Sequence, residues 1–168
     1  MWRAWRRCVI SSPSDKAQAS RRSRSFSIVV DGSNVAYEER TAEGKPRLEN
    51  LYLAMEALHK QYDRVIVIID AALHHQIDHP QELEDLLQRE VVIQAPAETE
   101  ADYFILETAD QLGADVLSND TFRQYHTHWP WIEDRRIPYM IVDDRFIIYR
   151  PAQAHSRMGH GQAQPAGG

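Results

Sequence analysis

Residues 26–34 read FSIVVDGSN, and this stretch decides the fold class. Five residues, most of them β-branched or aromatic, run without polar alternation, which predicts a strand that is buried on both faces of a parallel sheet. The strand ends abruptly in Asp31, and Asn34 follows three residues later. Asp, Gly, Ser and Asn are common turn residues, so a simple turn explains the segment. A metal site at the mouth of the strand explains it equally well.

The same kind of apolar run recurs along the chain and alternates with helical patterns. Strands are predicted at 26–31, 64–70, 91–95 and 114–118, and helices at 48–62, 80–90 and 98–113. Such alternation predicts an α/β fold with a central, mainly parallel sheet flanked by helices. The segment IPYMIVDDRFIIYR (137–150) predicts a last strand followed by a hairpin or an extension.

Composition predicts one folded domain with two tails. The 168 residues support a single core, placed at 26–150, between a leader (1–25) and a tail (151–168). No apolar run approaches the length of a membrane span. The single cysteine, Cys8, excludes disulfides within the chain and cysteine-based zinc sites, so we expect a cytoplasmic protein and no membrane partner.

Charge is distributed unevenly between these parts. The leader carries seven Arg and Lys against one Asp, whereas 26–150 carries 11 basic against 24 acidic side chains, a net charge of −13. The Arg- and Ser-rich leader fits a transit peptide, a disordered arm or an over-extended start equally well. The tail, rich in Gly, Ala, Gln and Pro, is expected to be disordered. The acidic core does not attract a polyanion by bulk charge, so nucleic acid binding would need cations or local arginines.

Acidic residues recur where the predicted strands give way to helices. Asp31 ends the first strand, Asp70 ends the second, and Asp120 lies just past the fourth. Asp102 opens the helix after the third strand, with Glu98 and Glu100 just upstream. Ligands of open α/β sheets bind at the carboxyl ends of the strands, where these acids would meet. Crowded like charges favour a cation, and oxygen ligands favour Mg²⁺ or Mn²⁺.

Each acid also has a purely structural interpretation. Asp31 fits an Asx turn, and Asp70 fits a loop. Thr99 and Asp102 have capping-box spacing, and Asp120 is placed to cap a short helix. Each interpretation is sufficient for its own residue, but together they leave the crowding of four like charges unexplained.

Five segments together resemble a known family. They are IVVDGSNVA, RVIVIID, EADYFILETA, VLSNDTFRQY and MIVDDRFII, and they are similar to the PIN-like NYN-domain ribonucleases, in particular the Regnase-like branch. The resemblance covers roughly 26–149. It implies a Rossmann-like PIN fold and Mg²⁺-dependent endonuclease activity on RNA. The CCCH zinc finger that accompanies animal members would need cysteines that this chain lacks.

The resemblance also implies roles for individual residues. Asp31 matches the first metal acid and Asn34 its companion, while Asp102 and Asp120 match the helix acid and the acid of the SND element. Two positions depart from the family pattern, because Ala101 and Gln124 stand where that branch has acids. Glu98 and Glu100 are candidates to replace the first missing acid, and Asp70 is a candidate to support the site.

The sequence therefore predicts a divalent-metal-dependent endoribonuclease with RNA as its partner; homo-oligomer formation is left open. Ser118, Arg123 and Asp70 are the candidates for substrate contact. Trp129 and Trp131 either stack bases or, as we favour, pack under the WPWIEDRR segment. The alternative is a non-catalytic RNA-binding domain with an incomplete metal site.

Overall fold

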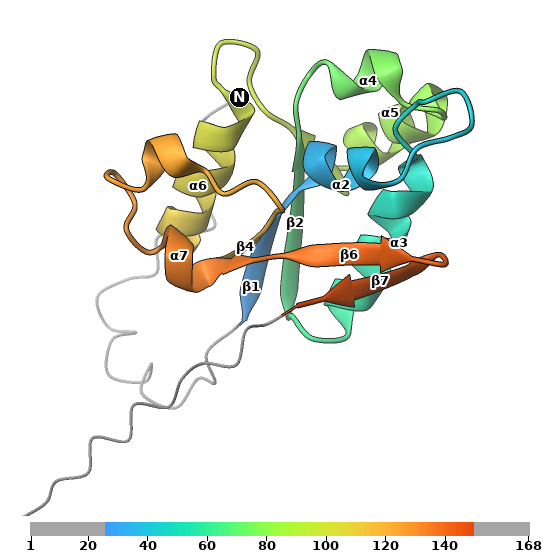
Figure 1. Cartoon of the computed structure of the whole chain (residues 1–168). Helices are drawn as coiled ribbons and strands as arrows, with labels where there is room; N and C mark the ends of the chain where they lie inside the picture. The colour runs from blue at the N-terminus through green and yellow to red at the C-terminus, as the bar shows by residue number, and fades with distance from the viewer. Residues whose placement is uncertain (1–25, 150–168) are drawn as a thin grey trace, which may run out of the picture.

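The computed structural model describes residues 26–149, which form a three-layer α/β domain (Figure 1). Its central sheet has the strand order β3-β2-β1-β4-β5, and every neighbouring pair is parallel. The strands are β1 (Ser27–Asp31), β2 (Arg64–Ile69), β3 (Val92–Gln94), β4 (Asp115–Leu117) and β5 (Arg136–Ile137). The predicted α/β class and parallel sheet are confirmed. The strands of the sheet end at one edge, as the site prediction requires.

Helices cover both faces of this sheet. The helices are α2 (Gly32–Glu38), α3 (Leu48–His59), α4 (Leu73–Gln76), α5 (Pro80–Gln88), α6 (Ala101–Leu112) and α7 (Ile132–Arg135), with a 3₁₀ turn at Arg123–Tyr125. Side chains of α2 to α5 share one apolar core with the sheet, and those of α6 and α7 share a second core on the other face. The two cores arise because the strands are apolar on both faces.

The predicted hairpin near the end of the domain is present but belongs to a separate sheet. Strands β6 (Tyr139–Val142) and β7 (Arg145–Ile148) pair antiparallel with each other only. Asp143 and Asp144 make the turn with φ angles of 51° and 54°, a backbone conformation that Asp tolerates better than most residues. Phe146 and Ile148 pack against the first core.

One helix was not predicted, and one predicted helix starts later than expected. Helix α2 was not predicted, because Asp-Gly-Ser-Asn has the composition of a turn; the chain instead enters a helix directly after Asp31, whose side chain caps it. The helix predicted at 98–113 begins only at Ala101 and ends at Leu112, before Gly113 in the left-handed conformation. Residues 96–99 form a turn closed by the Thr99 N–H and the Pro96 carbonyl.

The leader 1–25 and the tail 151–168 lie outside the described residues. Within 26–149 the structure has no helix that is long and apolar enough to cross a bilayer.

Gly32 is the point where β1 turns into α2 against the neighbouring strand. A β-carbon there would lie 2.7 Å from Ile69 Cγ2, 2.9 Å from the Ile68 carbonyl oxygen and 2.9 Å from Val67 Cγ1. The backbone oxygen cannot rotate away, so Gly32→Ala must shift the start of α2. We expect the free energy of unfolding to fall by about 1–3 kcal/mol in a urea titration. An unchanged urea midpoint would show that α2 can move away from β2 without a loss of stability.

Candidate active site

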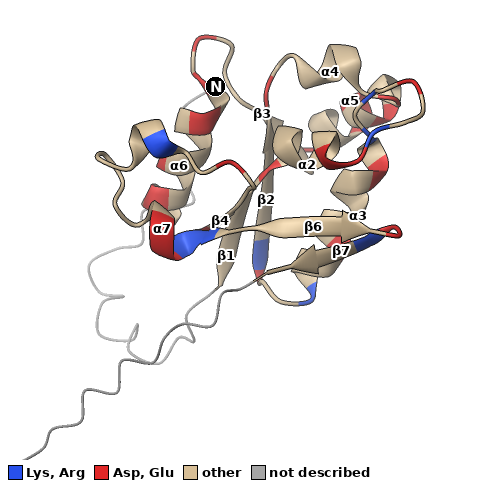
Figure 2. Cartoon of the chain, in the orientation of Figure 1, with Lys and Arg blue, Asp and Glu red and all other residues tan. Residues whose placement is uncertain are grey.

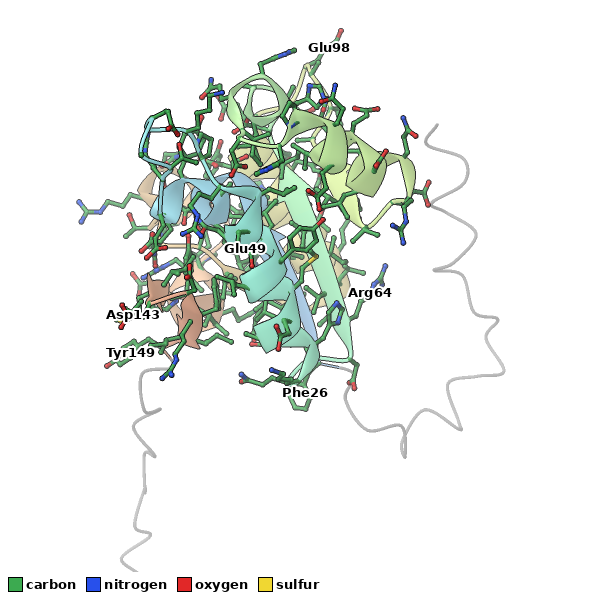
Figure 3. All side chains as sticks on the ribbon, turned by 90° about the vertical axis from the view of Figure 1, so that its right-hand side faces the viewer. Phe26, Glu49, Arg64, Glu98, Asp143 and Tyr149 are labelled. Atoms are coloured by element: carbon green, nitrogen blue, oxygen red, sulfur yellow. The ribbon has the colours of Figure 1, made fainter. Side chains whose placement is uncertain are left out.

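The acids predicted from the sequence lie along the carboxyl-end edge of the sheet. Asp31 ends β1, Asp70 follows β2, Asp102 lies in the first turn of α6, and Asp120 follows β4. Figure 2 shows acidic segments where these strands pass into their loops. In Figure 3, Phe26 marks the opposite edge. Four strand–helix junctions therefore deliver carboxylates to one side of the domain.

Asp31 is the most buried of these acids, with only 6% of its surface exposed. Its Oδ1 accepts a hydrogen bond from the Asn34 N–H at 3.1 Å, and its Oδ2 accepts one from the Ser118 hydroxyl at 2.8 Å. Burial, the largest cause, raises the pKa of Asp31 to about 6 together with the charges of Asp102 and Asp120, against the lowering effect of these two bonds. Asp31 thus caps α2, and its charged form is destabilised by burial and by neighbouring like charges.

Asp102 is surrounded by other acids. Burial raises its pKa, and the charges of Asp120, Glu100 and Asp70 raise it as well. Since such repulsion falls with distance, these carboxylates share one neighbourhood. The capping-box interpretation of Asp102 is wrong, because the N-cap of α6 is Glu100 and no side chain caps the helix.

Glu98 and Glu100 are placed differently. The helical spacing that related Glu98 to Asp102 does not exist, because the helix starts at Ala101. Glu98 is exposed and stands out at the end of the molecule in Figure 3. Glu100 instead accepts a hydrogen bond from the Tyr125 hydroxyl and raises the pKa of Asp102. The structure therefore brings Glu100, and not Glu98, to the carboxylate group.

Ser118 and Asp120 organise the loop after β4. Ser118 is completely buried; its hydroxyl donates to Asp31 and accepts a bond from the Asp120 N–H at 3.0 Å. The Asp120 carboxylate is exposed and accepts a 2.6 Å bond from the Phe122 N–H. The Ser118 carbonyl in turn accepts a 3.0 Å bond from the Arg136 guanidinium. Ser118 thus connects one acid of the site to the backbone of another.

Asn34 has partners that the sequence did not indicate. Its Oδ1 accepts hydrogen bonds from the Tyr139 hydroxyl at 2.8 Å and from the Asn119 N–H at 3.0 Å. The Asn119 side chain accepts a bond from the Tyr139 N–H and donates one to Glu38. Asn119 could have been singled out from its place in SND, whereas Tyr139 carries no local signal. The Asn34 oxygen is therefore occupied in joining α2, the loop after β4, and β6.

The remaining candidates lie at the margins of the edge. Asp70 has the predicted loop role, since its Oδ1 accepts a 2.8 Å bond from the Leu73 N–H, and its own N–H donates to the Ser33 hydroxyl at 2.9 Å. Its charge still reaches Asp102. Arg123 is exposed and begins the 3₁₀ turn.

The residue types at this edge fit a divalent cation. Asp31, Asp102 and Asp120 offer carboxylate oxygens and repel one another, a cost that a cation removes. Among residues 26–149, no three acidic, histidine or cysteine side chains form a group that could hold a metal ion by themselves. Mg²⁺ does not need such a group, because it usually keeps several waters and takes one or two protein carboxylates together with substrate phosphates.

Comparison with known proteins adds independent findings. Residues 24–160 match the family model described as the Zc3h12a-like ribonuclease NYN domain. Comparison with curated proteins found no match. Two similar solved structures are the crystal structure of nuclear proteinaceous RNase P 2 (PRORP2) from A. thaliana, with a TM-score of 0.60, and Arabidopsis thaliana nuclear protein-only RNase P 2 (PRORP2), with a TM-score of 0.59. Each is 18% identical and matches 82% of this chain.

The chain spans only 32% of the length of each of these two neighbours. At 18% identity they show that the fold is shared.

Proposed function

The chain belongs to the family of Zc3h12a-like ribonuclease NYN domains, and on this premise we propose that it is an endoribonuclease that hydrolyses RNA phosphodiester bonds with Mg²⁺ or Mn²⁺. The family is one of nucleases, and the predicted resemblance to it is confirmed over most of the chain. The metal dependence and the identity of the active carboxylates are the proposed part.

One observation carries the proposal: a buried carboxylate at the mouth of a central strand is crowded by two others. The pKa of Asp31 is raised to about 6 by burial and by Asp102 and Asp120. Capping alone would be served by Asn or Ser, which cap helices about as well and carry no charge. A carboxylate held at a cost to stability is typical of a functional site.

The proposed roles follow from the contacts. Asp31, Asp102 and Asp120 would hold the cation together with waters that it keeps, with Glu100 in support. When bound, such an ion lowers the pKa of water and offsets charge on the phosphoryl oxygens. Ser118 fixes the orientation of the Asp31 carboxylate. Because the Asn34 oxygen is taken by Tyr139 and Asn119, its amide NH₂ is the group we assign to a phosphate oxygen.

A second candidate function is a non-catalytic RNA-binding domain. It is favoured by Ala101 and Gln124, which stand at positions where the resemblance implies acids, and by the lack of a three-ligand group among residues 26–149. In that case the acids would bind a cation too weakly for hydrolysis.

The two candidates differ in cleavage. We expect the full chain to cut RNA in Mg²⁺ or Mn²⁺ and to stop in EDTA. Asp102→Asn should lower the rate by at least about 100-fold, since it removes a proposed ligand. Glu107→Gln makes the same chemical change in the same helix and should leave the rate unchanged. Intact RNA with the wild-type protein in both metals would favour the binding domain. A fully active Asp102→Asn would remove that residue from the site.

A further inference from the structure

Aromatic side chains gather beside the carboxylates on the α6 side of the domain. The Tyr103 ring centroid lies 5.2 Å from that of Trp129, 6.3 Å from that of Tyr125 and 6.5 Å from that of His128. Trp129 is only 5% exposed, whereas Tyr103 is 36% exposed and His128 is exposed too. Tyr103, Tyr125 and His128 thus form an aromatic ledge, with Trp129 as the buried ring beneath it.

The tryptophans themselves have packing roles. Trp129 belongs to the second core. Trp131 donates its Nε1 hydrogen to Asp110 at 2.8 Å, and the Arg135 guanidinium carbon lies 4.0 Å from its ring centroid. Trp129 is too buried to receive a base, and Trp131 is engaged by Asp110 and Arg135, so the tyrosines and the histidine are the groups that we assign to a base.

The ledge adjoins the candidate active site. Tyr103 directly follows Asp102 on α6, and the Tyr125 hydroxyl donates to Glu100. This hydrogen bond, followed by burial, raises the pKa of Tyr125 to about 12, and the charge of Asp102 contributes. A ligand on the ledge would therefore lie next to the carboxylates.

The face of the Tyr103 ring is not used by a parallel neighbour. The plane of the Tyr103 ring makes angles of 52°, 63° and 45° with the ring planes of Trp129, Tyr125 and His128. Within residues 26–149 the one stacked ring pair is Tyr139 with Phe146, in the hairpin. Tilted contacts hold Tyr103 in place from the side and below, which leaves a fixed, partly exposed aromatic surface.

We propose that this ledge stacks an unpaired RNA base beside the phosphodiester bond that water would hydrolyse at the carboxylate site. The inference rests on the proposed function and adds to it a base-binding subsite. Every nucleobase has a π face that stacks on Tyr or His, and in a duplex both faces are already covered.

Charge makes such a subsite useful to this protein. With a net charge of −13, residues 26–150 repel the phosphate backbone, so affinity must come from elsewhere. Stacking contributes affinity that does not depend on charge. Arg123, exposed at the start of the turn that ends in Tyr125, adds one cation beside the ledge.

The test measures binding without cleavage. The full chain carrying Asp31→Asn is titrated, in Mg²⁺, into a fluorescently labelled, unpaired oligoribonucleotide. We expect Tyr103→Ala to weaken binding about 5- to 100-fold and Tyr103→Phe, which keeps the ring, to stay within about threefold. Tyr149→Ala is the matched control, since Tyr149 is 58% exposed at the end of β7, far from Glu98 in Figure 3.

An oligonucleotide with abasic sites separates stacking from folding effects. The chain that carries Asp31→Asn alone, the parent, should bind the abasic oligonucleotide more weakly than the intact one. Adding Tyr103→Ala should not weaken binding to the abasic oligonucleotide any further. Equal binding of parent and Tyr103→Ala to the intact oligonucleotide would overturn the subsite. Cleavage by the wild-type chain is measured separately: a chain that binds through Tyr103 without cutting keeps the subsite and refutes the proposed function. A chain that cuts RNA but whose binding does not depend on Tyr103 supports the proposed function and refutes the subsite.

Discussion

Asp31→Asn is expected to abolish RNA cleavage while making the metal-free protein more stable near neutral pH. The activity should fall by about 100-fold or more, because the amide removes the charge and one of the oxygens that would face the cation. The same substitution should leave the fold intact. The amide oxygen of the new side chain can accept the hydrogen bond from the Asn34 N–H. Its NH₂ group can donate to the Ser118 hydroxyl, which can rotate to accept.

The gain in stability follows from the raised pKa of Asp31. Burial and the neighbouring charges raise it from 3.8 to about 6, so the folded state holds this proton more tightly than the unfolded state does. The resulting contribution to stability is fully present below the unfolded pKa and is lost as the pH rises through the folded pKa. An amide does not titrate and avoids this loss, so Asp31→Asn should gain about 2 kcal/mol near pH 7, after a small helix-dipole loss.

Urea unfolding in EDTA at several pH values measures this effect. The difference between Asp31→Asn and wild type should be large near pH 7 and shrink toward zero near pH 4. Glu107→Gln, on the same helix as Asp102, is the control for removing one carboxylate outside the site. Adding Mg²⁺ should stabilise the wild type more than the variant, because only the wild type has the full ligand set. A pH-independent difference would mean that Asp31 titrates as an ordinary carboxyl.

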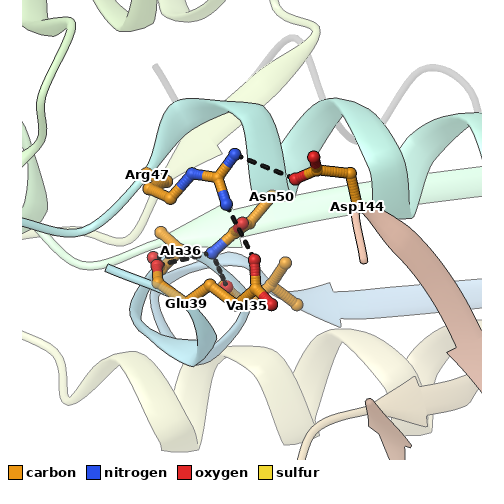
Figure 4. A network of polar contacts seen from close by, with 6 residues as sticks. All are labelled: Val35, Ala36, Glu39, Arg47, Asn50 and Asp144. Atoms are coloured by element: carbon orange, nitrogen blue, oxygen red, sulfur yellow. Dashed lines mark hydrogen bonds and ion pairs between the residues drawn. The ribbon is translucent and has the colours of Figure 1, made fainter. Parts of the chain in front are cut away.

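Asn50→Asp is expected to cause the largest loss of stability. Asn50 lies on α3 and is completely buried. Its single amide nitrogen donates to the carbonyls of Val35, Ala36 and Glu39, at 3.2, 3.1 and 2.9 Å, and so closes the end of α2 (Figure 4). An aspartate has almost the same shape but would set a charge against three carbonyl oxygens.

The expected cost is about 3–5 kcal/mol, because a buried charge loses its hydration and three acceptors lose their donor. That is a large share of the total for a domain of this size. The loss should become smaller at acid pH, where the new carboxyl takes up a proton. Gln81→Glu, the same chemical change at an exposed position of α5, should stay within about 0.5 kcal/mol. Similar midpoints for the two variants would show that Asn50 does not hold α2 in place.

Figure 4 also shows the ion pairs of Arg47 beside the end of α2. Arg47 pairs with Glu39 at 2.7 Å and with Asp144, in the hairpin turn, at 3.1 Å. Asn50 and Arg47 together connect α2 to α3 and to the β6–β7 hairpin. The hairpin carries Tyr139, which bonds Asn34. A change at the far end of α2 can therefore displace a candidate site residue.

The sequence by itself determined the layers of the fold and the residues of the carboxylate edge. Short, unalternating, β-branched runs such as 26–31 and 64–70 are typical of strands covered on both faces, and in a parallel sheet their ends meet at one edge. That is why Asp31, Asp70, Asp102 and Asp120 could be grouped without coordinates. The signal is local: it depends on the period of apolar residues and on which residue stands at the end of a run.

The tertiary structure alone decided which neighbours these acids have. Glu98 and Glu100 are only two positions apart in the sequence. Their different roles follow from the start of α6 at Ala101 and from the hydrogen bond that the Tyr125 hydroxyl donates to Glu100. Tyr139 meets Asn34 across 105 positions, and Ser118 meets Asp31 across 87. Helix α2 was missed for the same reason, since capping by Asp31 and closure by Asn50 override the turn composition of its first residues. Contacts between residues so far apart depend on how the layers pack, and no local pattern of residues records them.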